Sequence, residues 1–136
     1  MKIDNALLDS LTEQAKASPR LRMNYDLRTS ASDTSQRMLN ALLPRTEVPV
    51  HRHEDTSETV VCLRGRLVEI MYEEVNEYVE DGGDMTRRRG YREISRHLLC
   101  PAEGKYGLQI PKGVWHTVEV LEPSVIFEAK DGAYKG

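Results

Sequence analysis

From residue 44 onward the chain consists of short segments in which apolar and polar residues alternate, with turn-forming residues between them. The segments that fit strands are 47–53, 58–63, 67–73, 106–110, 116–121 and 125–130. Glycine or proline marks most of the intervening turns. Many short strands separated in this way predict an all-β fold, a single sandwich or barrel. The more polar stretch 74–96 is expected to form a long hairpin or excursion.

The first 17 residues differ from the rest, because apolar residues there recur at helical spacing. Asp4 is a suitable N-cap and Pro19 follows the expected end, so the pattern predicts an amphipathic helix over 4–17. Its apolar face consists of Ile3, Leu7, Leu8 and Leu11. One short strand is expected around residues 23–27, whereas 36–43 fits either a short helix or a buried strand. We expect residues 1–35, helix and lead-in strand, to pack on the barrel formed by 36–136.

Composition limits the classes of function. With 136 residues the chain has the size of one domain, and its net charge of −3 argues against a whole-surface nucleic-acid binder. No apolar run approaches the roughly 18 residues that span a bilayer, so no membrane association is expected. The acidic residues near the start do not fit a signal peptide, and Cys62 and Cys100 are too few for a disulfide framework. These features predict a cytoplasmic protein with reduced thiols.

Three histidines and one glutamate carry the chemistry suggested by the sequence. Side chains alternate along a strand, so His51 and His53 should project to the same face. Glu58 can return to them after a short turn, and His116 can join from a later strand of a closed barrel. Such a set suits one divalent transition metal ion, zinc, iron, manganese, nickel or copper. The alternative is a pair of exposed histidines on an edge strand.

The spacing of these residues resembles two cupin motifs. His51-x-His53, four residues, Glu58, six residues and Gly65 are similar to the first motif, and Pro111-x-Gly113-x-x-His116 is similar to the centre of the second. The first motif usually opens with glycine where this chain has Arg45. The second usually ends in asparagine where Val120 stands, and its leading glycine is displaced by one, at Gly104. None of these departures affects a ligand position. The resemblance implies a jelly-roll barrel with a metal at His51, His53, Glu58 and His116.

Longer segments resemble the WbuC family of small cupin-fold metalloproteins. They are Gln36–Leu42, Leu63–Leu67, Pro111–Val118 and Phe127–Tyr134, and the similarity extends over nearly the whole chain. Many members of that family are encoded among genes for surface polysaccharide synthesis, such as O-antigen or capsule, so the resemblance implies a sugar or nucleotide-sugar ligand. The resemblance does not imply a particular reaction, because the family has no settled one. Where the family leads us to expect a histidine after Asn24–Leu27, this chain has Arg28.

Further residues are candidates for ligand binding. Five arginines lie between 87 and 96, and they fit either a solvated hairpin or a clamp for phosphate or carboxylate. Glu128 and Lys130 share a strand face and either support the pocket or form an outward-facing pair. Trp115 and Cys62 are expected in packing roles, and His97 on the surface. The candidate ligand-binding residues are Arg28, Tyr72, Arg88, Arg92 and Glu128.

Two functions of different classes follow. The first is a metal-dependent enzyme that acts on a sugar or nucleotide-sugar, and the second is a non-catalytic protein that binds or senses a small ligand through its metal. A structural metal in a scaffold is a weaker third reading. The fold alone cannot choose among them, because cupins host many activities. We also expect a homodimer, since pairing covers the open edges of a small barrel.

Overall fold

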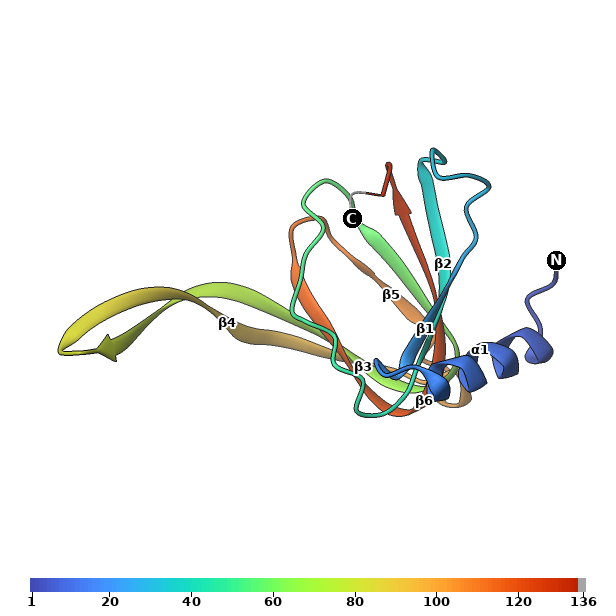
Figure 1. Ribbon diagram of the computed structural model, residues 1–136, viewed down its shortest axis with the longest axis horizontal. Helices are drawn as coiled ribbons and strands as arrows, with labels where there is room; N and C mark the ends of the chain where they lie inside the picture. The colour runs from blue at the N-terminus through green and yellow to red at the C-terminus, as the bar shows by residue number, and fades with distance from the viewer. Residues whose placement is uncertain (135–136) are drawn as a thin grey trace.

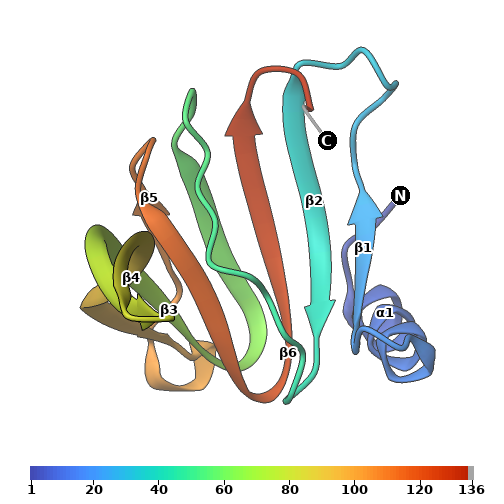
Figure 2. The same cartoon turned by 60° about the vertical axis from the view of Figure 1, so that its left-hand side comes forward.

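Six strands form one antiparallel sheet that curls into an open barrel, with an α-helix against its outside (Figures 1 and 2). The computed structural model describes residues 1–134. The elements are α1 (Asn5–Ala17), β1 (Arg22–Asp26), β2 (Ser35–Leu42), β3 (Glu58–Asp81), β4 (Asp84–Leu99), a 3₁₀ turn (Pro101–Glu103), β5 (Gly107–Ile110) and β6 (Trp115–Asp131). This confirms the predicted all-β barrel with an N-terminal helix.

The strand order is β1-β2-β6-β3-β4, and β5 pairs with the first residues of β3. β3 and β6 are each longer than predicted, because 58–63 and 67–73 join into one strand, as do 116–121 and 125–130. Bulges stand where the sequence predicts turns, and they bend both strands (Figure 2). Gly65 allows this bend: its φ is +98°, and a Cβ there would collide with Ser124 on β6.

The predicted strand at 47–53 is wrong, because this stretch is a loop that pairs with the sheet backbone at one isolated bridge, between His51 and His116. Pro49 has no N–H to donate to a ladder. Side chains hold the loop instead. Thr117 Oγ1 donates to the Val48 carbonyl at 2.5 Å, and Arg22 Nη1 donates to the Glu47 carbonyl at 2.5 Å.

Two apolar clusters lie on the two faces of the sheet. The barrel interior contains Leu42, Val60, Cys62, Leu67, Leu99, Ile110, Val120 and Ile126. The outer cluster lies under α1 and contains Leu8, Leu11, Ala15, Leu39, Ala41, Leu43 and Val125. Residues 36–42 are therefore a strand covered on both faces, and this explains why their pattern shows no simple alternation.

The helix begins as predicted, because Asp4 accepts a hydrogen bond from the Leu7 N–H at 3.1 Å. Leu8, Leu11 and Ala15 are buried against the sheet. Ile3, expected on this face, is instead 50% exposed, since it precedes the helix and lies beyond its contact with the sheet. Within residues 1–134, no helix is long and apolar enough to cross a membrane.

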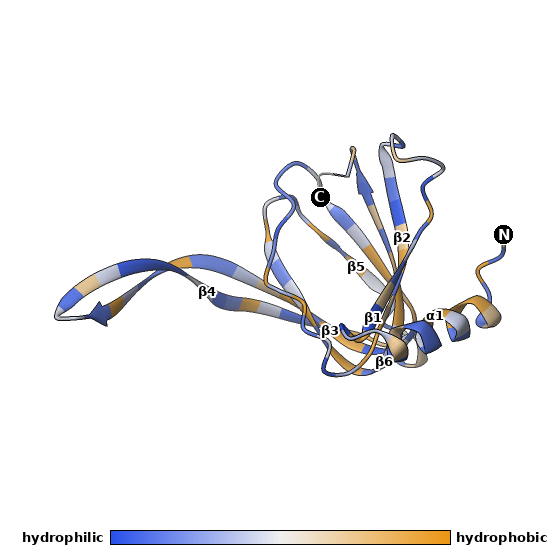
Figure 3. Cartoon of the chain, in the orientation of Figure 1, coloured by the Kyte–Doolittle hydropathy of each residue, from blue (hydrophilic) through white to orange (hydrophobic). Residues whose placement is uncertain are grey.

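The polar stretch 74–96 lies in a two-stranded arm, formed by the distal halves of β3 and β4, that projects from the barrel (Figures 1 and 3). Arg92 Nε donates to Glu73 at 2.6 Å, and Arg88 Nε donates to Glu77 at 3.0 Å. The arm is thus a solvated hairpin with cross-strand ion pairs, which is one of the two readings of the arginine-rich segment.

Candidate metal centre

Two neighbouring histidines of one loop, His51 and His53, meet His116 of β6 at the mouth of the barrel. The ring centroids of His51 and His116 are 4.3 Å apart, those of His51 and His53 are 5.3 Å apart, and those of His53 and His116 are 5.6 Å apart. Each ring can offer one nitrogen such that all three nitrogens lie within 4.8 Å of one another. The structure therefore brings together the three histidines that the sequence analysis predicted as metal ligands.

Backbone carbonyls orient two of these rings. His51 Nδ1 lies 2.9 Å from the Pro49 carbonyl, and His116 Nδ1 lies 2.9 Å from the Val114 carbonyl. A carbonyl only accepts, so Nδ1 must carry the proton, which leaves the lone pair on Nε2. Metal-binding histidines commonly have their second nitrogen fixed in this way.

Glu58, the first residue of β3, faces the same point. Its Oε2 lies 3.1 Å from His53 Nε2 and 3.5 Å from His116 Nε2. Glu58 is buried, and Oε2 has no partner in hydrogen-bond geometry among residues 1–134. Burial alone would raise the pKa of Glu58, but the close His116 and His53 rings in their protonated form, together with the Lys130 charge, hold the pKa below its usual range. The carboxylate is therefore ionised and available.

Loop contacts place the two neighbouring histidines. His51 exchanges main-chain hydrogen bonds of 3.0 and 2.8 Å with His116, and the Gly113 N–H donates to the His53 carbonyl at 2.7 Å. Arg52, between them, turns away and lies 4.5 Å from the Trp115 ring centroid. Trp115 thus packs outside the cluster, as the alternation along β6 predicts.

This arrangement fits a divalent metal ion. Ligand atoms about 2.0–2.2 Å from one ion lie roughly 3 Å apart, and the spacings of 3.1 and 3.5 Å from Glu58 to two imidazoles are close to that value. A buried carboxylate oxygen that faces imidazole lone pairs is costly unless a cation or proton lies between them. His51, His53 and His116 therefore form a cluster whose ligand atoms are spaced closely enough to hold a metal ion, and Glu58 lies next to two of these rings.

The sheet register adds polar groups to the interior face beside the cluster. Lys130 on β6 lies between Gln36 on β2 and Glu58 on β3, and Glu128 lies one inward step further along β6. Glu128 thus lies on the interior face beside the cluster, and burial raises its pKa. Lys130 shares this inward face, so the two residues do not form an outward pair.

Glu69 is a site residue that the sequence analysis missed. It is 4% exposed, and burial with the neighbouring Glu58 charge raises its pKa to about 8. Together with Asn40, whose Oδ1 is buried without a hydrogen-bond partner in the described chain, it lines a cavity of about 40 Å³ behind His51 and His116. The sequence held one signal for this position. Glu69 lies two residues after Leu67 on the same strand, so it faces the same side as Leu67, which is fully buried.

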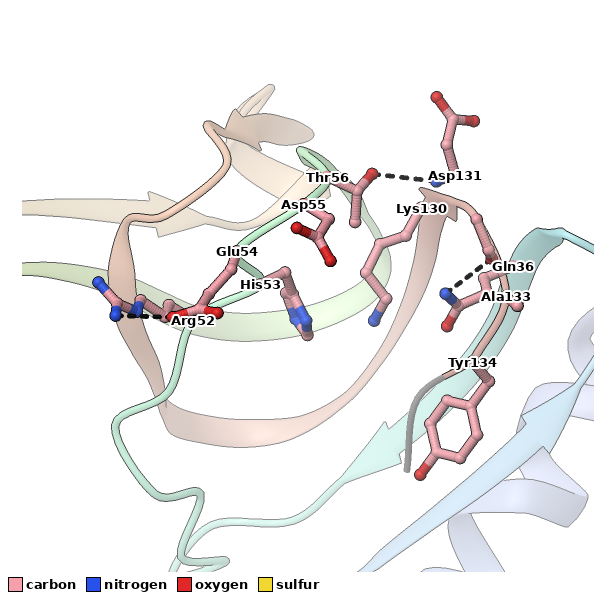
Figure 4. Close-up of a pocket in the computed structure, with 11 residues that line it drawn as sticks. Gln36, Arg52, His53, Glu54, Asp55, Thr56, Lys130, Asp131, Ala133 and Tyr134 are labelled. Carbon is pink, nitrogen blue, oxygen red and sulfur yellow. Dashed lines mark hydrogen bonds and ion pairs between the residues drawn. The ribbon is translucent and has the colours of Figure 1, made fainter.

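Two larger cavities open in front of the cluster. One of about 160 Å³ is lined by His51, His53, Glu58, Glu128, Lys130 and residues of β1 and β2. The other, of about 500 Å³, lies between the 52–56 loop and the chain after β6 (Figure 4). The second is within the range of about 300–1,000 Å³ typical of small-molecule sites.

The other predicted ligand-binding residues do not reach these cavities. Arg28 pairs with Asp26 at 2.8 Å and lines a separate cavity near the end of the chain. Arg88 and Arg92 lie on the arm, which projects away from the mouth (Figure 1). Tyr72 lies at the base of the arm, 6.4 Å from the Tyr91 ring. The arginine clamp for a nucleotide-sugar would need the hairpin to fold over the mouth, and it does not.

Solved structures share this fold at low sequence identity. TT1209 from Thermus thermophilus is 21% identical with a TM-score of 0.58, and the match covers 98% of this chain and 100% of that one. An oxalate oxidase in complex with the substrate analogue glycolate is 12% identical with a TM-score of 0.55, and the match covers 88% of this chain and 55% of that one. The Schizosaccharomyces pombe Cnp3 cupin domain is 9% identical with a TM-score of 0.52, and the match covers 82% of this chain and 64% of that one. The chain thus spans about half the length of oxalate oxidase.

These likenesses establish the cupin fold, and no curated protein matches the chain. Residues 3–82, more than half of the sequence, match a family described as "Domain of unknown function (DUF6016)". That match covers α1, the ligand loop and Glu58, and it stops before His116. The chain therefore belongs to the family described as Domain of unknown function (DUF6016), and its fold is that of a cupin.

Proposed function

We propose that the chain binds one divalent transition metal ion through His51, His53, Glu58 and His116 and presents it to a small hydroxylated ligand. The observation that carries the proposal is the buried Glu58 Oε2, which has no hydrogen-bond partner in the described chain and faces the His53 and His116 imidazoles of the three-histidine cluster. Zinc, iron, manganese and nickel all suit three histidines and one carboxylate.

A bound ion of this kind polarises an oxygen of its ligand or activates water near neutral pH. This chain's own residues supply the enclosure: the cavity of about 160 Å³ lies directly over the cluster, and Glu128 lines its wall. We favour an enzyme over a purely binding or sensing protein, because these cavities give a ligand access to the cluster. The resemblance to the WbuC family supports a sugar-related ligand, in the context of surface polysaccharide synthesis.

Metal analysis of protein purified without chelators tests the proposal. We expect one equivalent of metal in the wild type and a loss of most of it in the single variants His51→Ala, His53→Ala and His116→Ala. His97→Ala is the matched control, since His97 is exposed on β4 and its Nε2 lies 3.1 Å from Ser95 Oγ. Equal metal content in all five proteins would refute the site, and so would a wild type that binds none of the four metals on titration.

A further inference from the structure

We infer that Lys130 anchors an oxyanion of the ligand whose hydroxyl groups reach the metal, so that the substrate class is a small hydroxylated anion. This inference rests on the proposed function, because it needs the ion at the histidine cluster. It assigns to Lys130 a role in selecting the ligand that is separate from holding the metal.

The sheet register fixes Lys130 next to the metal ligands. On β6 it pairs with Glu58 of β3 on one side and with Gln36 of β2 on the other, so these three side chains lie in one row across the interior face. Gln36 is buried and donates through Nε2 to the Gly132 carbonyl at 3.0 Å. Lys130 is therefore the positively charged residue of the row Gln36, Lys130 and Glu58, and it lies directly beside the proposed metal ligand Glu58.

Lys130 also lies where the two front cavities meet. The cavity of about 160 Å³ over the cluster and the outer cavity of about 500 Å³ share two lining residues, His53 and Lys130. In Figure 4 the Lys130 side chain extends from β6 into the outer cavity, on the side where the His53 ring lies. A ligand that passes from the outer cavity to the metal must therefore pass the ammonium group.

The ammonium group is not committed to a protein partner. Within residues 1–134 it makes no hydrogen bond or ion pair, although its charge acts on Glu58 and Glu128. Both of these carboxylates line the inner cavity and are absent from the lining of the outer one. Lys130 alone among the three faces the outer cavity, so an incoming anion meets the positive charge first.

The acidic residues of the outer cavity do not cancel this charge. Glu54, Asp55 and Asp131 also line it, but all three are exposed, whereas Lys130 is half-buried. Glu54 is paired with Arg52 at 2.8 Å. Charges in water at the rim are screened more than a partly buried charge is, so the inner end of the cavity is the attractive end for an oxyanion.

A carboxylate or a phosphate satisfies a lysine equally well as a point charge. A hydroxylated anion would place its oxyanion on Lys130 and a hydroxyl oxygen on the ion at His53. The ligand would thus be either a sugar acid or a sugar phosphate, and the shared chemistry is an oxyanion beside hydroxyl groups.

The experiment uses calorimetry on the metal-loaded full chain with D-glucuronate, D-glucose 6-phosphate and D-glucose as probes. We expect at least one of the two anions to bind about tenfold or more tightly than glucose, because the charged contact adds to the hydroxyl contacts. Lys130→Met should remove that preference, Lys130→Arg should keep most of it, and Lys112→Met is the matched control. Lys112 is exposed on the turn next to His53, so its loss removes the same charge without touching the row.

Each outcome decides the matter when metal content is measured in the same samples. Preference for glucuronate alone identifies a sugar acid, and preference for the phosphate alone identifies a sugar phosphate. If the metal-loaded wild type binds none of the probes, or binds glucose as tightly as the anions, the inference is wrong while the metal site stands. Equal effects of Lys130→Met and Lys112→Met would also overturn it. A wild type without metal would defeat the proposed function first.

Discussion

His51 and His116 are joined by two main-chain hydrogen bonds, of 3.0 and 2.8 Å, and their rings lie 4.3 Å apart on the same side of that bridge. The bridge ties a loop without regular structure to the first residues of β6. The spacing of two metal ligands is therefore set by the backbone and does not depend on side-chain packing alone. Such preorganisation lowers the cost of assembling the site when the ion arrives.

Replacing Glu58 with Gln should weaken metal binding by about tenfold or more while leaving the barrel folded. The amide keeps the shape of the carboxylate but removes the negative charge that faces the imidazoles. The measurement is the metal-dependent rise in melting temperature, compared with that of Glu80→Gln, an exposed position on the arm. An unchanged rise in Glu58→Gln would remove Glu58 from the ligand set.

Glu69 should make the metal-free protein less stable as the pH rises. Its pKa is about 8 in the folded chain, above the ordinary value near 4.5 expected when unfolded. Between these values the folded state holds a proton that the unfolded state has lost, so stability falls with rising pH, by at most about 1.4 kcal/mol per pH unit.

Glu69→Gln removes this titration. We therefore expect the chelator-treated variant to gain free energy of unfolding relative to the wild type between pH 5 and pH 8, measured by urea denaturation. Glu80→Gln again serves as the control, since it is exposed. Parallel pH profiles for the wild type and Glu69→Gln would contradict the assignment.

Local alternation of apolar and polar residues sufficed to predict an all-β barrel, and the resemblance to two cupin motifs sufficed to predict that His116 joins His51 and His53. Neither sufficed for features that depend on register between distant strands. The bend at Gly65 joins two predicted strands into one, and Glu69 and Lys130 face the interior because of their partners on β6 and on β2 and β3. The three histidines come together although the strand predicted for His51 and His53 is wrong: the His51 bridge and the His53 contact with Gly113 orient these two histidines in place of strand parity.

Both cysteines should resist thiol reagents in the folded protein. Cys62 and Cys100 are unpaired and buried, and burial raises the pKa of the Cys62 thiol to about 11, so little thiolate exists at neutral pH. Reaction with an aromatic disulfide reagent should be slow in buffer and should reach two equivalents in denaturant. Rapid labelling of the native chain at either cysteine would show that the interior opens.

Leu11→Ala should destabilise the protein by about 2–5 kcal/mol, the usual cost of truncating a buried leucine. Leu11 is 1% exposed and packs in the cluster between α1 and the outer face of the sheet. Ile3→Ala is the control, because Ile3 is 50% exposed and should cost little. Chemical denaturation measures both, and equal losses would mean that α1 does not hold its place on the sheet.

The arm should be dispensable for the metal site and required for a homodimer, which remains our expectation for the chain. Beyond Tyr72 the two strands of the arm pair with each other, and a lone two-stranded ribbon is only marginally stable in water. Its outer edges carry unpaired main-chain groups, β3 is rich in glutamate and β4 in arginine, and Tyr78 and Met85 near the tip are 62% and 64% exposed. A second copy of the chain offers the matching strand edge.

Replacing residues 75–90 with Asn-Gly closes the ribbon by a tight turn after Glu74, which pairs with Tyr91. We expect light scattering to give twice the monomer mass for the full chain and the monomer mass for this variant, both with one equivalent of metal. A dimeric variant would place the interface on the barrel. A full chain that stays monomeric at high micromolar concentration would exclude the dimer, and the arm would then be free for another partner.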